Sequence, residues 1–146
     1  MGSYSVAVRT TATAVQTALW ELRTAAGIDV LVYEIGIFIT GGSSGQLYAL
    51  ARSPIQGVTP SSPVTVLPDD GNGPAGNTKV AIAWTGKPPP MPYTGHLRRY
   101  LPMTSSFGHG VVWTFPRGLA IPPASSLGIW NIGLGSAVDI YVHLDE

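Results

Sequence analysis

The sequence predicts an all-β protein, an antiparallel β-sandwich of about eight strands with one short helix near the N-terminus. Hydrophobic residues make up 45% of the 146 residues, which is enough to form a core. Charged residues make up only 11%, which is fewer than the surface of a helical bundle usually carries. The 18 Gly and 13 Pro residues break the apolar stretches into short pieces, as expected for strands joined by loops. Several pieces alternate with period two, the period of a strand.

The first element is expected to be a strand over residues 3–10. Tyr4, Val6 and Val8 alternate there with small or polar side chains, which is typical of a half-buried strand. Because this strand stands at the end of the chain, residues 1–10 are also available as an N-terminal arm that adds to the sheet edge of a neighbouring molecule.

A helix is expected over residues 14–26. Thr13 and Gln16 stand at capping-box spacing, and Gly27 stands where helices commonly end in a left-handed residue. Apolar residues recur at positions 15, 19, 22 and 26, which are helical intervals. The sequence therefore predicts one amphipathic helix with its apolar stripe on the core.

Residues 28–40 predict a long strand. Both of its faces are largely apolar, so we expect it to be central in its sheet. The Gly- and Ser-rich residues 41–45 predict a turn, and residues 46–52 are expected to return as its hairpin partner. One face of the long strand is predicted to hold Leu31, Tyr33, Ile35, Ile37 and Ile39, and the other Val30, Val32, Glu34 and Phe38.

The rest of the chain alternates short strands with Pro- and Gly-rich loops. The Pro-rich run at residues 86–92 is expected to cross the surface in polyproline conformation, because proline cannot donate to a central ladder. No internal repeat or long linker divides the chain, so residues 1–146 are interpreted as a single domain. The remaining predicted strands are residues 64–67, 79–84, 96–101, 110–115, 119–123 leading into 126–131, and 137–144.

Composition narrows the classes of partner. The 8 Lys or Arg residues balance the 8 Asp or Glu residues, so the chain lacks the basic footprint of proteins that bind nucleic acid or anionic membranes. No apolar run approaches the about 18 residues of a membrane span, and the first residues do not resemble a signal peptide. The absence of cysteine excludes disulfides, zinc-thiolate sites and a thiol nucleophile. We expect no nucleic-acid and no membrane partner.

Two glycine motifs imitate known sites. Residues 71–76 match GxGxxG, but a pyrophosphate site needs a strand before the motif and a helix after it. Residues 41–45 match GxSxG, but a nucleophile elbow belongs to a parallel α/β sheet, which this sequence does not predict. Both motifs are interpreted as loops. Asp69, Asp70, His96 and His109 do follow the GxSxG motif in the chain order in which a hydrolase triad has its acid and its base.

The titratable residues form no recognisable catalytic or metal set. His96, His109 and His143 are too far apart in sequence to form a paired-ligand motif. Asp69, Asp70 and Asn72 lack the other ligands of a calcium loop. We therefore predict no catalytic residue, no metal site and no cofactor.

The order of segments resembles the jelly-roll decoration, or cement, proteins of tailed bacteriophages. The matching segments are Leu19-Trp20-Glu21-Leu22, Tyr33-Glu34-Ile35-Gly36-Ile37, and the closing stretch from Leu119-Ala120-Ile121-Pro122 to Glu146. The run from Pro88 to Pro92 has no counterpart in that family. The resemblance implies a jelly-roll sandwich and a non-enzymatic virion protein, a homotrimer that binds the major capsid protein on the outer surface of the head and stabilises the coat lattice.

Candidate contact residues follow from this expectation. They come from the N-terminal strand, from the Pro-rich run, whose backbone is already restricted, and from an arginine pair that an interface suits better than nucleic acid. Two alternatives remain open: a carbohydrate- or receptor-binding jelly-roll module of a virion fibre, and a small cupin-like enzyme. The candidate interface residues are Tyr4, Val6, Val8, Arg9, Met91, Tyr93, Arg98 and Arg99.

Overall fold

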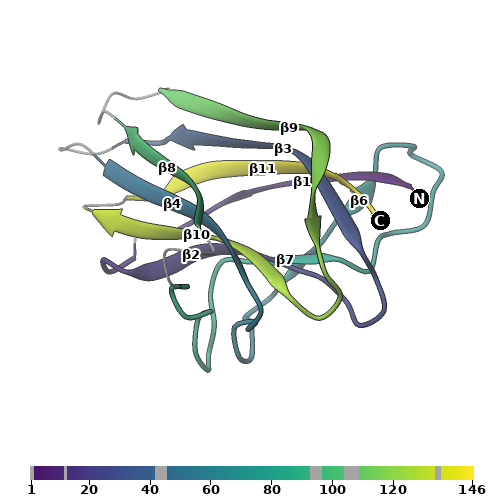
Figure 1. The fold of residues 1–146 in the computed structure, drawn as a ribbon, viewed down its shortest axis with the longest axis horizontal. Coiled ribbons are helices and arrows are strands. Elements are labelled where there is room, and N and C mark those ends of the chain that lie inside the picture. Colours follow the sequence, from purple (N-terminus) through teal and green to yellow (C-terminus); the bar gives the residue numbers. More distant parts are fainter. Residues whose placement is uncertain (1, 12, 42–45, 93–96, 104–108, 134–135) are drawn as a thin grey trace.

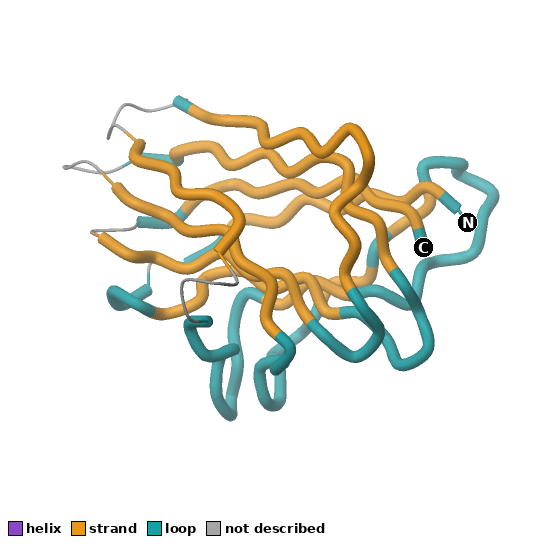
Figure 2. Tube along the Cα trace, viewed as in Figure 1, coloured by secondary structure: helices purple, strands orange, loops and turns teal. Residues whose placement is uncertain are grey.

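The computed structural model describes residues 2–11, 13–41, 46–92, 97–103, 109–133 and 136–146, with backbone only for residues 97–103. In these residues the protein is all-β, with two antiparallel sheets and no helix, which confirms the predicted β-sandwich (Figures 1 and 2). The strands are β1 (Ser3–Arg9), β2 (Thr17–Arg23), β3 (Val30–Ile39), β4 (Gln46–Ser53), β5 (Val64–Thr65), β6 (Leu67–Pro68), β7 (Lys79–Ala81), β8 (Leu97–Met103), β9 (Gly110–Ile121), β10 (Ser126–Gly133) and β11 (Val138–Asp145).

The chain crosses repeatedly between the two sheets. The first sheet has the strand order β6-β1-β11-β3-β9, and the second has the order β5-β7-β2-β10-β4-β8. Figure 1 shows β9, β3 and β11 along one side of the sandwich and β8, β4, β10 and β2 along the other. Most strands that follow one another in sequence therefore lie in different sheets, and strands that pair are mostly distant in sequence.

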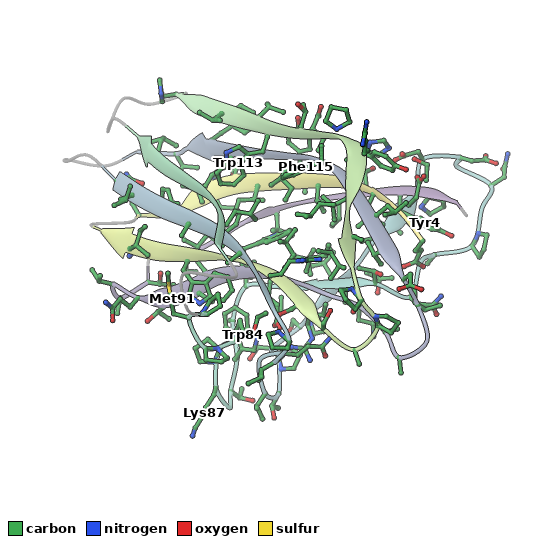
Figure 3. All side chains as sticks on the ribbon, viewed as in Figure 1. Tyr4, Trp84, Lys87, Met91, Trp113 and Phe115 are labelled. Carbon is green, nitrogen blue, oxygen red and sulfur yellow. The ribbon has the colours of Figure 1, made fainter. Side chains whose placement is uncertain are left out.

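The core lies between the sheets and is built from alternate residues of each strand. β11 shows the pattern most clearly, because its residues are alternately buried and half-buried along its whole length. Trp113 and Phe115 of β9 close the core near one edge, as Figure 3 shows, and each is only 8% exposed. Period-two alternation predicted strands such as β1 and β11 because each has one face on this core.

A β-bulge in β3 changes the predicted assignment of its faces. Val30 and Val32 point into the core, but so do Ile35, Ile37 and Ile39, all at most 2% exposed. The register with β11 shifts between His143 and Leu144, so Tyr33 is an extra residue in β3. One inserted residue moves every later side chain to the opposite face. The strand is central as predicted, but strict alternation along its whole length was wrong.

The predicted helix over residues 14–26 is wrong, because residues 17–23 form β2. Val15 and Ala26, which a helix would place on the core, are exposed, Val15 by 53%. Gln16 has a φ of 64° and donates its backbone N–H to the Asn131 carbonyl at 2.6 Å. The cap-like residues therefore make a left-handed turn into a strand, and pairing with β7 and β10 overrides the helical spacing.

The predicted hairpin between residues 28–40 and 46–52 is also wrong. β4 lies in the second sheet and pairs with β10 and β8, whereas β3 pairs with β11 and β9. The strands predicted at residues 110–115 and 119–123 are one bent strand, β9. Its residues 115–118 are skipped by the ladder, since Thr114 lies opposite Glu34 and Leu119 lies opposite Val32.

Loops cover the outer face of the second sheet. There Trp130 of β10 packs with Ala18 and Ala51, and Trp84 and Met91 close this second cluster from the loop side. Figure 3 shows Trp84 and Met91 on this side of the sandwich, with Lys87 at the tip of a loop. β2, β4 and β10 are therefore almost fully buried, which leaves little alternation for sequence analysis to detect.

A buried carboxylate fixes these loops to the sheet. Glu21 is 0% exposed and forms an ion pair with Arg23 at 2.8 Å. Its carboxylate also accepts hydrogen bonds from the Gly57 backbone N–H at 2.8 Å and from Trp84 Nε1 at 3.0 Å. Among the described residues, the donors to this buried charge come from β2 and the covering loops, so Glu21 links the loops to the sheet.

Candidate interaction surface

Exposed side chains mark the outer face of the first sheet, among them Arg9, Val112 and Thr114. We define the outer face as the side chains of β1, β11, β3 and β9 that point away from the core. The strand register places them in rows that run across the four strands. Three successive rows are Arg9, Asp139, Phe38 and Gly110; then Ala7, Tyr141, Gly36 and Val112; then Ser5, His143, Glu34 and Thr114.

Two aromatic rings cover glycines at the centre of the outer face. Tyr141 lies over Gly36, where an added Cβ would come within 2.0 Å of its ring, and Phe38 lies over Gly110, where an added Cβ would come within 2.1 Å. The two rings are 6.1 Å apart between centroids, with planes 18° apart. Each ring lies on the backbone of the next strand, so together they form a flat apolar area.

The hydroxyl of Tyr141 is held by a carboxylate. Tyr141 donates to Glu34 Oε1 at 2.5 Å. This hydrogen bond, together with partial burial and the charge of Glu34, raises the pKa of Tyr141 to about 12. The phenol therefore remains protonated over the whole physiological pH range, and its ring is fixed at both ends.

Arg9 and Asp139 form a two-point ion pair at one end of the outer face. Arg9 Nε and Nη2 donate to the two carboxylate oxygens of Asp139 at 2.7 and 2.8 Å. The hydrogen bond from Arg9 lowers the pKa of Asp139, and the same pairing raises the pKa of Arg9. The two side chains are 69% and 44% exposed, so the pair orders the surface more than it stabilises the fold.

Asp69 gathers a polar cluster at the other end of the outer face. Its Oδ1 accepts from Ser5 Oγ at 2.6 Å and its Oδ2 accepts from Ser3 Oγ at 2.8 Å. His143 Nε2 lies 3.0 Å from Asp69 Oδ2 and 2.8 Å from Ser3 Oγ. The hydrogen bond from Ser5 is the main reason that the pKa of Asp69 is lowered.

Ser3, His143 and Asp69 are the residue types of a hydrolase triad but do not have its geometry. A triad places serine and aspartate on opposite imidazole nitrogens, so that histidine takes the serine proton. Here both groups lie against Nε2, and Ser3 donates directly to Asp69. The cluster therefore holds the loop after β6 against β1 and β11, and it has no group arranged to activate the serine.

The predicted contact residues lie in several different places. Tyr4, Val6 and Val8 pack against the core, and Arg9 lies on the outer face. Met91 belongs to the cluster beneath the loops of the second sheet. Arg99 of β8 lies opposite Leu50 of β4, and Arg98 lies where the register between β8 and β4 shifts. Tyr93 lies outside the described residues.

Sequence reasoning missed the residues that shape the outer face. Asp69, Glu34, Phe38, Tyr141 and His143 come from β11, β3 and one loop, and only the register brings them together. The alternation in residues 138–145 contained part of the signal, because its outward half is Asp139, Tyr141, His143 and Asp145.

The motifs interpreted as loops have the following positions. Residues 70–73 form a turn in which the Gly73 N–H donates to the Asp70 carbonyl at 2.9 Å and the Asn72 N–H donates to Asp70 Oδ1 at 3.1 Å. Most of the 41–45 motif and His96 lie outside the described residues. Within the described ranges, no three His, Asp or Glu side chains gather as a metal site.

The comparisons with known proteins add no relative. No family model matches the chain, and neither a curated protein nor a solved structure is significantly similar to it. Among the described residues, no helix is long and apolar enough to span a membrane.

Proposed function

We propose that this sandwich is a jelly roll. Eight strands form two four-stranded halves, β1-β11-β3-β9 and β2-β10-β4-β8, while β5, β6 and β7 add to the edges. Supporting this, the first four long strands alternate between the two sheets, as do the last four. This is the strand order expected when a long hairpin is folded over into a double Greek key.

We further propose that the protein is a virion structural protein, a capsid decoration protein that binds the major capsid protein on the outside of a phage head. The observation that carries the proposal is the outer face, which combines a flat aromatic centre with ionised groups that already have partners. Such a surface docks with a smaller electrostatic penalty than one with unpaired charges, because Arg9, Asp139 and Asp69 keep their partners when water is removed.

Stabilisation of the lattice would then be a mass-action effect. A protein that binds the assembled coat and not the dissociated coat lowers the free energy of the assembled state. Contacts that are weak in one copy become effective when a homotrimer engages several coat subunits at once. The proposed location is the outer surface of the capsid.

Co-sedimentation with heads prepared without this chain tests the proposal. Wild-type protein should pellet with the heads and saturate at a fixed number of copies per head. Phe38→Glu, at the centre of the outer face, should weaken binding by at least about tenfold, because it buries a charge without a partner. Val64→Glu on the second sheet is the control, since Val64 is 42% exposed. Wild-type protein that stays in the supernatant would refute the proposed function.

A second candidate function is carbohydrate or receptor binding, favoured by the two nearly parallel rings of Phe38 and Tyr141. Flat aromatic faces flanked by carboxylates suit the stacking and hydrogen bonding of a sugar. Glycan-array binding that is lost in Tyr141→Leu would favour this candidate over the first. An array on which wild-type protein binds nothing would remove it.

A further inference from the structure

Among the described residues, the first sheet has an unpaired stretch of backbone at each of its two edges. No described strand pairs with these stretches. On one side, β6 covers β1 only at Tyr4 and Ser5, which leaves Val6–Arg9 without a partner strand there. On the other side, β9 pairs with β3 alone. We call these segments the β1 edge (residues 6–9) and the β9 edge (residues 110–114).

The hydrogen-bonding groups that face outward at each edge follow from the register. Gly2 and Glu146 exchange backbone hydrogen bonds of 2.9 and 3.1 Å, so the even residues of β1 bond to β11, and Ala7 and Arg9 face the β1 edge. The Ile39 N–H donates to the His109 carbonyl at 2.8 Å, so the odd residues of β9 bond to β3. Gly110, Val112 and Thr114 therefore face the β9 edge.

Neither edge carries the usual protection against another strand. Natural edges are blunted by proline, by unpaired charge or by a bulge. The β9 edge has none of these until Pro116 and Arg117, where the strand bends. The β1 edge has one charge, Arg9, and Asp139 neutralises it. A shallow open hollow of about 460 Å³ runs along the β1 edge, lined by Ala7, Val8, Arg9 and Asp139.

We propose that the occupant of each edge is a second copy of this chain, with the β9 edge of one copy pairing antiparallel with the β1 edge of the next. The two edges lie at opposite ends of the same rows, because Ala7 and Val112 share one row and Arg9 and Gly110 share the next. Strand direction alternates across the sheet, so β9 of one copy meets β1 of the next in the orientation that continues the ladder. The β9 edge also has no charge to oppose Arg9.

This contact is head-to-tail, so it closes a ring or extends a chain rather than forming a two-fold dimer. It deepens the homotrimer part of the proposed function and rests on it only for the number of copies in a ring. The adjoining segments limit the pairing, because β6 occupies the edge beside Ser5 and β9 bends at Pro116. Ala7 of one copy therefore faces Val112 or Thr114 of its neighbour.

Engineered cysteines test this pairing directly, because the chain has no cysteine of its own. Within one molecule, Ala7 and Val112 are separated by β11 and β3, or roughly 14 Å at about 4.8 Å per strand, which is too far for a disulfide. Mild oxidation of a mixture of Ala7→Cys with Val112→Cys, or with Thr114→Cys, should give a cross-linked heterodimer. Cross-linking of the separate single variants should stay at background.

Homodimers of Ala7→Cys alone or Val112→Cys alone would overturn the proposal in favour of two-fold pairing. The absence of any mixed cross-link would overturn it as well. The assay uses free protein, so it fails or succeeds independently of binding to heads.

Proline variants give a second, independent readout. Ala7→Pro and Val112→Pro each remove an N–H that faces an edge and leave the bonds to β11 and β3 intact. Each should weaken self-association in sedimentation velocity by about tenfold. Ala7→Ser and Val112→Thr, which keep the N–H, should associate like wild type, and equal association of all four variants would contradict the proposal.

Discussion

At the scale of single residues, alternation along a strand predicts which side chains share a face, but it does not predict which of the two faces is exposed. Tyr4, Val6 and Val8 were predicted as contacts because they are apolar, yet the apolar half of a strand is the half that the core takes. The outward half, Ser3, Ser5 and Ala7, carries the surface chemistry. The role of Glu34 was equally hidden, because its partner Tyr141 is 107 residues away.

The Glu34–Tyr141 hydrogen bond predicts a delayed tyrosine titration. Tyr141 should ionise near pH 12, as its raised pKa requires, and Glu34→Gln should bring this ionisation back toward the ordinary value of about 10. Because the folded-state pKa is raised, the stabilisation it reflects is complete below about pH 10 and is lost as pH rises through about 12. Absorbance of the phenolate against pH, with the Tyr141→Phe titration subtracted, measures the shift. An unchanged titration in Glu34→Gln would contradict it.

At the scale of elements, the sequence predicted where strands begin and end better than what they pair with. β1, β3 and β11 were predicted closely because each has one face on the core and another facing outward. β2 was mistaken for a helix because both its faces are buried and its turn at Gln16 and Gly27 imitates helix ends. β4 was assigned to the wrong sheet because alternation contains no information about partners, which here are distant in sequence.

The loops that cover β2, β4 and β10 should depend on Glu21. Glu21→Ala leaves the Arg23 guanidinium, the Gly57 N–H and Trp84 Nε1 without their shared acceptor. We expect a loss of about 3 kcal/mol in the free energy of unfolding, measured by urea denaturation with tryptophan fluorescence. Asp29→Asn, which removes an exposed carboxylate, should change it by less than about 0.5 kcal/mol. Equal effects of the two variants would show that Glu21 does not hold the loops.

At the scale of the whole molecule, the two sheets differ in what covers them. Strands β2, β4 and β10 of the second sheet are buried on both sides, by the core and by the Pro-rich loops, whereas outward residues of the first sheet such as Arg9, Val112 and Thr114 are exposed. The sequence predicted the loops but not that they lie over a sheet, since that depends on Trp84 and Met91 meeting Trp130 across the fold. Of the described contact residues that were predicted from the sequence, Arg9 is therefore the one that the structure places on the outer face.

Acid should loosen the corner where β1, β11 and the loop after β6 meet. The pKa of Asp69 is lowered mainly by the hydrogen bond from Ser5, so its contribution is complete above the unfolded value of about 3.9 and is lost as pH falls through the lower folded value. The thermal midpoint of wild type should therefore decrease as the pH is lowered below about 4. In Asp69→Asn this decrease of the thermal midpoint should be smaller. Asp70→Asn, in the same loop, is the matched control. A curve for Asp69→Asn that parallels wild type would rule out this role.

The exchange of backbone hydrogen bonds between Gly2 and Glu146 makes the polypeptide nearly a closed circle. A short flexible linker could join these two residues without disturbing the two sheets, and new ends could then be opened in the exposed turn at residues 71–75. Peptides fused to the present ends would emerge together from one corner, so a pair of tags placed there would report on each other by energy transfer.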